Sequence, residues 1–192
     1  AYLTPDSKRV SEFRERYRRL GDGPVIGISW RSGNYKVGTR KSLHLSTLAP
    51  LLKLSGAVFV NLQYGDCKEE LESLARDSGI RLYTDDAVDA LKDLDAFAAQ
   101  VAAMDLVIST SNSTVHFAGA LDVPVWTLLP RGDALLWYWF RDCENSVWYP
   151  GMRLFRQDNP GDWSGPIKRI QGMLPAFIAA HQRGAIKNSE VL

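Results

Sequence analysis

Cysteine is scarce in this chain of 192 residues. The two that occur, Cys67 and Cys143, are far apart and fit neither a zinc-ligand pattern nor the disulfide framework of small secreted domains. This scarcity is typical of a reducing compartment, so we expect a cytoplasmic location. Long apolar runs are also absent. Runs such as 123–129 are far shorter than the ~20 residues that cross a bilayer, and the sequence predicts no transmembrane segment.

An excess of charge of either sign is lacking too. The chain has 23 Lys plus Arg against 22 Asp plus Glu, which gives a formal net charge of +1. Proteins that bind DNA or RNA gain affinity from an excess of cations on one face, so nucleic acid is not an expected partner. This balance still allows a local basic pocket.

Several motifs of common enzymes are missing as well. The segment 29–34 (SWRSGN), which follows the first apolar run, contains neither G-x-G-x-x-G nor G-x-x-x-x-G-K-[ST], and this disfavours a plain NAD or ATP enzyme. The chain has no H-E-x-x-H, no closely spaced cysteine pair and no nucleophile elbow. We therefore expect neither a bound metal nor a cofactor.

The composition that remains is that of an ordinary globular protein, with 45% hydrophobic and 23% charged residues. A chain of this length buries about 70% of its surface on folding, which is sufficient for one complete core. Continuous apolar runs predict strands at 25–30, 57–62, 106–109 and 124–129, with a shorter one at 81–83. Strands that are apolar on both faces and separated by helices indicate a parallel sheet that is covered on both sides.

Helical spacing of apolar residues predicts helices at 7–20, 46–53, 68–78, 95–104, 114–121 and 167–181. Pro175 is expected to kink the last helix or to start a new one. The predicted fold class is therefore α/β, a doubly wound, Rossmann-like parallel sheet of about five or six strands. The segment 131–162 is the least regular, and we expect its aromatic residues to pack into the core or against another domain, although they could line a binding cleft: Trp137, Tyr138, Trp139, Trp148 and Tyr149.

The chain begins without Met and runs directly into a helical pattern, as a piece of a longer chain would. We divide it into residues 1–24, a linker and helix that follow an absent amino-terminal half; residues 25–163, the Rossmann-like domain; and residues 164–192, a carboxyl-terminal helix and tail.

A polar run, 109–116 (STSNSTVH), follows the strand at 106–109. Ligands of such sheets bind outside the carboxyl ends of the strands. Hydroxyl groups and the backbone N–H groups at the positive end of a helix dipole would meet here and favour a phosphate. The candidate binding residues are Ser111, Asn112, Ser113, Thr114 and His116. The alternative is that Ser111 or Asn112 caps the helix without any ligand.

Two further loops carry candidate residues. After the first strand, which contains Ser29, the cations Arg31, Lys36, Arg40 and Lys41 could neutralise a diphosphate, or they could simply be solvated.

After the second strand, Gln63 precedes Gly65, which permits a close turn. Glu69 or Glu70 could accept hydrogen bonds from sugar hydroxyls. The alternative is that these two glutamates only complement the dipole of the helix that they begin.

The segment 105–130 (DLVISTSNSTVHFAGALDVPVWTLLP) resembles the ADP-heptose:lipopolysaccharide heptosyltransferases and the related glycosyltransferase domains that follow tetratricopeptide repeats. Looser similarity at 25–31, 40–43, 62–66 and 148–155 extends the resemblance over most of residues 2–163. It implies the carboxyl-terminal half of a GT-B glycosyltransferase, a Rossmann-like domain that holds a nucleotide-diphosphate sugar without a metal, in a bacterial protein.

By position, Lys41 resembles the cation on the diphosphate and Glu69 the ribose-binding acid, while Asn112, Ser113 and His116 resemble the phosphate-facing start of the helix. The implied partners are a UDP-, GDP- or ADP-linked sugar, an unidentified glycan or protein acceptor, and an amino-terminal half or repeat domain. In this family the general base that activates the acceptor belongs to the amino-terminal half.

The chain departs from the family at three positions. Ser111 stands where heptosyltransferases usually have Asp, and Asn112 replaces Thr, so heptose is not implied as the sugar. Asp122 stands where the family often has Gly, and we expect a left-handed backbone there, which Asp tolerates.

Two hypotheses follow. The first is a donor-binding domain of a metal-independent inverting glycosyltransferase, in which Lys41, with Arg31 or Arg40, and the helix start at Ser113 offset charge on the leaving diphosphate. The alternative is a noncatalytic nucleotide-sugar-binding or protein-interaction module with the same fold.

Overall fold

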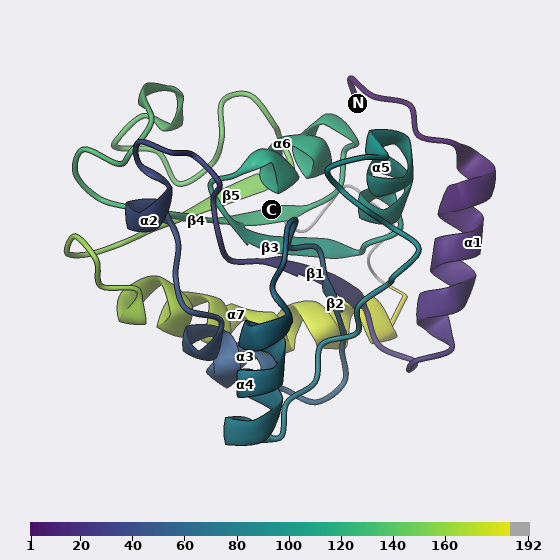
Figure 1. The fold of residues 1–192 in the computed structure, drawn as a ribbon. Coiled ribbons are helices and arrows are strands. Elements are labelled where there is room, and N and C mark those ends of the chain that lie inside the picture. The colour runs from purple at the N-terminus through teal and green to yellow at the C-terminus, as the bar shows by residue number, and fades with distance from the viewer. Residues whose placement is uncertain (185–192) are drawn as a thin grey trace.

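The computed structural model describes residues 1–184. Its centre is a five-stranded sheet with the order β2-β1-β3-β4-β5 (Figure 1). All four neighbouring pairs are parallel, which confirms the predicted fold class. The strands are β1 Val25–Ser29, β2 Val58–Asn61, β3 Leu106–Thr110, β4 Val125–Leu129 and β5 Met152–Arg156.

Helices cover both faces of this sheet (Figure 1). Helices α1, α5 and α6 contribute to the core on one face, and α3, α4 and α7 contribute to the core on the other. Their bounds are α1 Ser7–Arg18, α2 Gly38–Lys41, α3 Ala49–Leu52, α4 Lys68–Ser78, α5 Leu94–Ala102, α6 Ser113–Ala120 and α7 Ser164–Gln182, with 3-10 turns at Leu45–Leu48 and Trp137–Trp139.

The two cores explain why the central strands are apolar along their whole length. Side chains of a strand alternate between faces. In β3, Val107 packs into the core under α5 and α6, while Leu106 and Ile108 pack into the core over α3 and α7. A strand that is buried on both faces favours apolar residues along its length, so most polar residues lie at the strand ends, although Thr127 is buried in the middle of β4.

Two expectations about the strands were wrong. The segment 81–83 makes a single bridge, between Val60 and Tyr83, and does not form a strand. The fifth strand is β5, which lies in the segment expected to be least regular. Its sequence, MRLFR, lacks the continuous apolar run of the other strands. Cations are tolerated in it because β5 lies at the edge of the sheet, where Arg153 and Arg156 are only partly buried.

The helices also differ from expectation at two places. The predicted helix 46–53 is a 3-10 turn followed by the single turn of α3, where Pro50 occupies one of the first helical positions. Helix α7 continues through Pro175 without a break. Pro175 is on the exposed side of α7, so water can take the place of the hydrogen bond that proline cannot donate. The predicted tail at 185–192 lies outside the described residues.

The turn after α6 is as expected, because Asp122 has a φ of 61° in the left-handed region. Helix α1 packs against α5 and buries Phe13 and Tyr17 in the core of residues 25–163. None of the helices in residues 1–184 is long and apolar enough to cross a lipid bilayer.

Candidate functional site

The sheet changes its winding direction between β1 and β3. From β1 the chain crosses to β2 on one side, and β3 then returns to the other side of β1. Ser29 and Ser109 are register partners at this point, and the loops that follow their strands therefore separate toward opposite faces of the sheet. Ligands of doubly wound sheets bind in the crevice that such a change of direction opens.

Asn112 joins the two loops at this crevice. Its Nδ2 donates to Ser29 Oγ at 2.8 Å and to the Arg31 carbonyl at 2.9 Å. Its Oδ1 accepts from the backbone N–H of Thr114 at 2.9 Å, so Asn112 is the N-cap of α6. Asn112 rather than Ser111 therefore caps α6, and both ends of its amide are used within the protein.

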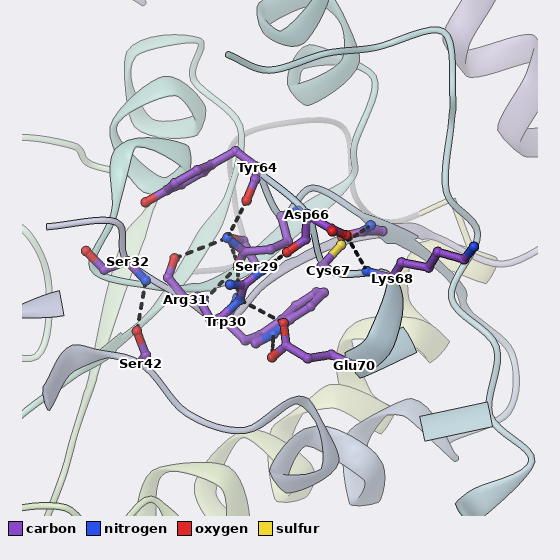
Figure 2. Close-up of polar contacts among 12 residues, drawn as sticks. Ser29, Trp30, Arg31, Ser32, Ser42, Tyr64, Asp66, Cys67, Lys68 and Glu70 are labelled. Atoms are coloured by element: carbon purple, nitrogen blue, oxygen red, sulfur yellow. Dashed lines mark hydrogen bonds and ion pairs between the residues drawn. The ribbon is translucent and has the colours of Figure 1, made fainter. Parts of the chain in front are cut away.

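Gln63 joins the third loop to the same place. Its Oε1 accepts from the backbone N–H groups of Trp30 at 2.9 Å and Arg31 at 2.7 Å, and from Ser29 Oγ at 3.1 Å. Its Nε2 donates to the Tyr64 carbonyl at 3.1 Å. Figure 2 shows this cluster of contacts between the loop after β1 and the loop after β2. The side chains that join the loops at the crevice were all predicted as binding residues: Ser29, Gln63 and Asn112.

Lys41 places a cation beside the start of α6. The side chain is 3% exposed, and its Nζ donates to the Ser111 carbonyl at 2.6 Å. Burial lowers the pKa of this ammonium from its ordinary value of 10.5. The Thr110 hydroxyl donates to the Lys41 carbonyl, so α2 and the end of β3 are joined at both the side chain and the backbone.

The first turn of α6 offers backbone donors at the same point. Ser113 is the first helical residue and is exposed, whereas Thr114 is buried. The N–H groups of a first turn have no acceptor within their own helix, and here Asn112 supplies one only for Thr114. Ser111 is turned away from this turn, because its Oγ accepts from the Trp139 indole at 2.7 Å.

His116 lies among aromatic side chains rather than at the tip of the helix. Its ring stacks on Trp139, with 5.3 Å between the ring centroids, and its Nδ1 is 3.2 Å from the Tyr149 hydroxyl. Burial lowers the pKa of His116, and the charge of Lys41 lowers it further, so the imidazole is mainly neutral at pH 7. The imidazole and its aromatic neighbours form one wall beside the α6 start.

Arg31 and Arg40, two other cations of the loop after β1, pair with acidic residues. Arg31 Nε is 2.8 Å from Glu70 Oε2, and its Nη2 donates to the Asp66 carbonyl at 2.7 Å (Figure 2). Arg40 pairs with Asp133 at 3.4 Å. Glu70 and Asp133 thus orient these two arginines, whereas Lys41 Nζ contacts the Ser111 carbonyl just before the start of α6.

The two glutamates that follow the loop after β2 have different surroundings. Glu69 is exposed on the first turn of α4, while Glu70 accepts from the Trp30 indole at 2.8 Å and pairs with Arg31. Gly65 has a φ of 75°, as its turn requires. Sequence reasoning missed the role of Trp30, and it did not identify Ser111 and His116 as the partners of Trp139 and Tyr149, because these partners are distant in sequence.

Two cavities flank this crevice. One of about 500 Å³ is lined by Arg31, Tyr64 and Glu70, and a second of about 520 Å³ lies beside Gly65 and is lined by the segment 84–92. In residues 1–184 no group of three or more His, Cys, Asp or Glu side chains is arranged to hold a metal ion. The arrangement can thus receive an anion at Lys41 and α6 and a ring system in a neighbouring cavity.

Comparison with solved structures identifies the architecture. The E. coli ADP-heptose LPS heptosyltransferase II superimposes with a TM-score of 0.61 at 18% identity, covering 94% of this chain and 54% of the enzyme. A glycosyl transferase family 9 protein from Veillonella parvula gives a TM-score of 0.62 at 12% identity, covering 96% of this chain and 54% of that protein. The fold is one half of a GT-B glycosyltransferase.

This GT-B half also has a curated relative, Protein FlbA of Caulobacter vibrioides, which is 35% identical over 184 residues. The alignment covers 94% of this chain but 30% of FlbA. The chain thus spans about half the length of the two solved structures and less than a third of FlbA. No protein-family model matches the chain. The resemblance to heptosyltransferases that the motifs indicated is confirmed as a likeness of fold.

Proposed function

We propose that this GT-B half is the donor-binding domain of a metal-independent, inverting glycosyltransferase that uses a nucleotide-diphosphate sugar. The observation that carries the proposal is the 2.6 Å contact between Lys41 Nζ and the Ser111 carbonyl. It sets a cation beside the first turn of α6, at the change of winding where ligands of doubly wound folds bind. Residues 1–24 then act as the linker from a preceding half.

The electrostatics favour a diphosphate at this point. Burial penalises the charged form of Lys41, and a phosphate beside it offsets that penalty. The first-turn N–H groups of α6 add partial positive charge and direct hydrogen bonds. When the glycosidic bond breaks, negative charge grows on the leaving diphosphate, and donors already in place stabilise it without reorganisation. No metal is needed for this step.

The nucleoside is assigned to the cavity beside Gly65, between the loop after β2 and the segment 84–92. Glu69, which is exposed at the edge of this loop, is the proposed acceptor for ribose hydroxyls. The sugar is assigned to the side of α6 that carries His116, where Tyr138, Trp139 and Tyr149 surround the imidazole. The acceptor, a glycan or a protein, and the general base belong to the remainder of the whole protein.

Calorimetric titration of the 192-residue chain with ADP, GDP and UDP tests the diphosphate site. Ser113→Asp places a carboxylate at the exposed first position of α6, where it favours the helix but repels a diphosphate. We expect at least one nucleotide to bind, Ser113→Asp to weaken it at least tenfold, and the melting temperature to stay equal or rise.

The matched control is Ser7→Asp, which makes the same change at the exposed first position of α1. It should leave nucleotide affinity unchanged. If none of the three nucleotides binds, or if both aspartate variants behave alike, the assignment to α6 is wrong.

A noncatalytic nucleotide-sugar-binding or protein-interaction module is the second candidate. It is favoured by Ser111, which stands where heptosyltransferases have Asp and whose hydroxyl is bound to the Trp139 indole instead of facing the crevice. The enzyme and the nucleotide-sugar-binding module both predict nucleotide binding, whereas a protein-interaction module does not require it. Release of nucleotide from a bound nucleotide-sugar, measured on the whole natural protein with a cell extract as acceptor source, supports the enzyme; binding without release supports the module.

A further inference from the structure

A separate, larger cavity lies at the carboxyl ends of β4 and β5. Its volume is about 1020 Å³, at the upper end of the range for small-molecule pockets. The loop after β4 forms one side, and the residues at the end of β5 form the other. The lining residues that bear on its chemistry are Arg131, Trp137, Phe140, Arg141, Arg156 and Gln157.

Positive charge dominates the wall of this cavity. Three arginines line it, and Asp142 is the one acidic residue among the lining side chains in the part of the chain that the structure describes. Arg131 is anchored, because its Nη1 donates to the Asp158 carbonyl at 3.0 Å. The nearby Asp133 is paired with Arg40 and does not line the cavity. The cavity therefore attracts an anion.

Two residues that line the cavity each have a buried donor without a partner among residues 1–184. Gln157 is 1% exposed, and its Oε1 accepts from the backbone N–H groups of Arg131 at 3.0 Å and Gly161 at 3.1 Å. This fixes the amide and leaves Nε2 without an acceptor. Arg156 is fixed likewise: Nη2 donates to the Trp139 carbonyl at 2.9 Å, while Nη1 has no acceptor. Unpaired buried donors are rare in folded proteins.

The rim of the cavity is aromatic. Trp137 is 76% exposed and Phe140 is 45% exposed, although both residues are large and apolar. Phe140 also has a φ of 53°, a left-handed conformation that an aromatic residue adopts rarely. Exposed rings beside arginines fit a ligand that has both an anionic group and a ring with an apolar face.

We propose that this cavity binds a small organic molecule that carries a carboxylate or a phosphate on a ring of sugar size. The oxyanion accepts from Gln157 Nε2 and Arg156 Nη1, and the rings of Trp137 and Phe140 cover the ligand. Both nitrogens are shielded from solvent, so a neighbouring side chain rotates as the ligand enters. This site is separate from the diphosphate site at α6 and stands whether or not that site binds nucleotide.

Three hexoses that share a ring but differ in charge test the proposal: glucose 6-phosphate, glucuronate and glucose. They are titrated into the isotope-labelled 192-residue chain, and binding is followed by the NMR shifts of amides in the segments 130–142 and 156–161. We expect one or both anionic hexoses to bind there and neutral glucose not to bind. Glucose 6-phosphate alone identifies a phosphate ligand, and glucuronate alone identifies a carboxylate ligand.

The deciding variant is Gln157→Glu, which keeps the oxygen that holds Arg131 and Gly161 but replaces the unpaired donor with a carboxylate oxygen. The variant should lower the affinity for the anionic hexose about tenfold or more, because a charge-assisted hydrogen bond is replaced by a repulsion between two negative charges. Arg18→Gln, which removes an exposed cation from α1, is the control and should change nothing.

Two further outcomes separate this site from the diphosphate site. Saturating nucleotide should not displace the anionic hexose, and Ser113→Asp should not weaken it. The proposal is overturned if neither anion shifts these amides, if glucose binds as well as the anions do, or if Gln157→Glu leaves the affinity unchanged while the variant remains folded by its melting curve.

Discussion

The carboxyl edge of the sheet has two polar regions that are built in opposite ways. At the β1–β3 end, the side-chain amides of Asn112 and Gln63 have acceptors and donors on both ends, so the crevice is rigid before any ligand arrives. At the β4–β5 end, Gln157 and Arg156 each keep one buried donor without a partner in the described part of the chain, residues 1–184. The amides that join the loops of the first region are satisfied at both ends, although the buried Thr114 Oγ1 beside them has no partner among residues 1–184, whereas the amide of Gln157 in the second region is satisfied only at its oxygen.

This difference shows that a buried amide can either join two loops or offer a hydrogen bond to a ligand, depending on whether the protein already satisfies both of its ends. Gln63 and Gln157 are both buried glutamines that follow a strand, and each accepts backbone N–H groups through Oε1. Only the neighbours of Nε2 differ. The predictions below are ordered from the largest expected effect to the smallest.

Asn112→Ala should have the largest effect on stability. The substitution removes the cap of α6 and leaves the polar groups around Ser29 and Arg31 without a partner, which should lower the free energy of unfolding by about 2–4 kcal/mol. Urea denaturation measures this difference. Asn34→Ala, which removes a local and exposed turn bond, is the control and should cost less than about 1 kcal/mol. Equal losses in the two variants contradict the bracing role of Asn112.

The same substitution, Gln to Glu, should give different results in the two regions. In Gln63→Glu a carboxylate oxygen faces the carbonyls of Arg31 and Tyr64, and the free energy of unfolding should fall by about 2–3 kcal/mol. In Gln157→Glu the new oxygen replaces a donor that has no acceptor among residues 1–184, so no hydrogen bond is lost and the free energy of unfolding should fall by less than in Gln63→Glu, by about 1 kcal/mol. Parallel urea denaturation curves compare the pair, and similar losses would show that the two amides have similar surroundings.

Lys41 should make stability and nucleotide binding depend on pH in opposite directions. Its folded-state pKa lies below the ordinary value of 10.5, so between these two pKa values the unfolded chain holds more protons than the folded chain. The free energy of unfolding therefore gains a contribution that rises with pH across this interval. Nucleotide affinity should fall over the same interval, because the diphosphate needs the charged ammonium.

Melting curves and calorimetry across this interval measure both trends, and Lys41→Met should abolish both. The control is Lys36→Met, which removes an exposed ammonium from the same loop. If Lys36→Met abolishes the trends equally, they do not arise from the buried Lys41.

Arg40→Gln should have the smallest effect. The 3.4 Å pair with Asp133 is exposed, so its loss should change the free energy of unfolding by less than about 0.5 kcal/mol. Asp133→Asn should do the same. A loss well above this value in either variant would mean that the pair holds the loop after β4 against α2 and thereby links the two regions.

Much of the fold follows from local patterns. The apolar runs of β1 to β4 and the helical spacing of α1 and α4 to α6 are signals within short segments, so these elements were predicted within a few residues. Strand β5 was not, because an edge strand is buried only in part and Arg153 and Arg156 interrupt its apolar pattern. The prediction that Pro175 would kink or divide α7 was wrong. A proline is tolerated where it is exposed, and that exposure cannot be predicted from the residues beside it.

The candidate site was predicted as a set of loops but not as a geometry. Lys41 and the segment from Ser111 to Thr114 do meet, since both follow adjacent parallel strands. Arg31 and Arg40 were expected beside them, yet Glu70 and Asp133 orient them elsewhere. Nothing in the spacing of the sequence indicates those partners, because each pair is joined by tertiary contact.

The sequence by itself determined the type of sheet and the positions of its polar loops, and it narrowed the cap of α6 to Ser111 or Asn112, because periodicity and capping depend on residues a few positions apart. Only the tertiary structure decided which polar atoms are satisfied. Gln63 and Gln157 look alike in the sequence, and Asn112 resembles any helix cap. Whether a buried donor has an acceptor depends on chain segments that arrive from far along the sequence, and this separates the braced crevice of this protein from its open cavity.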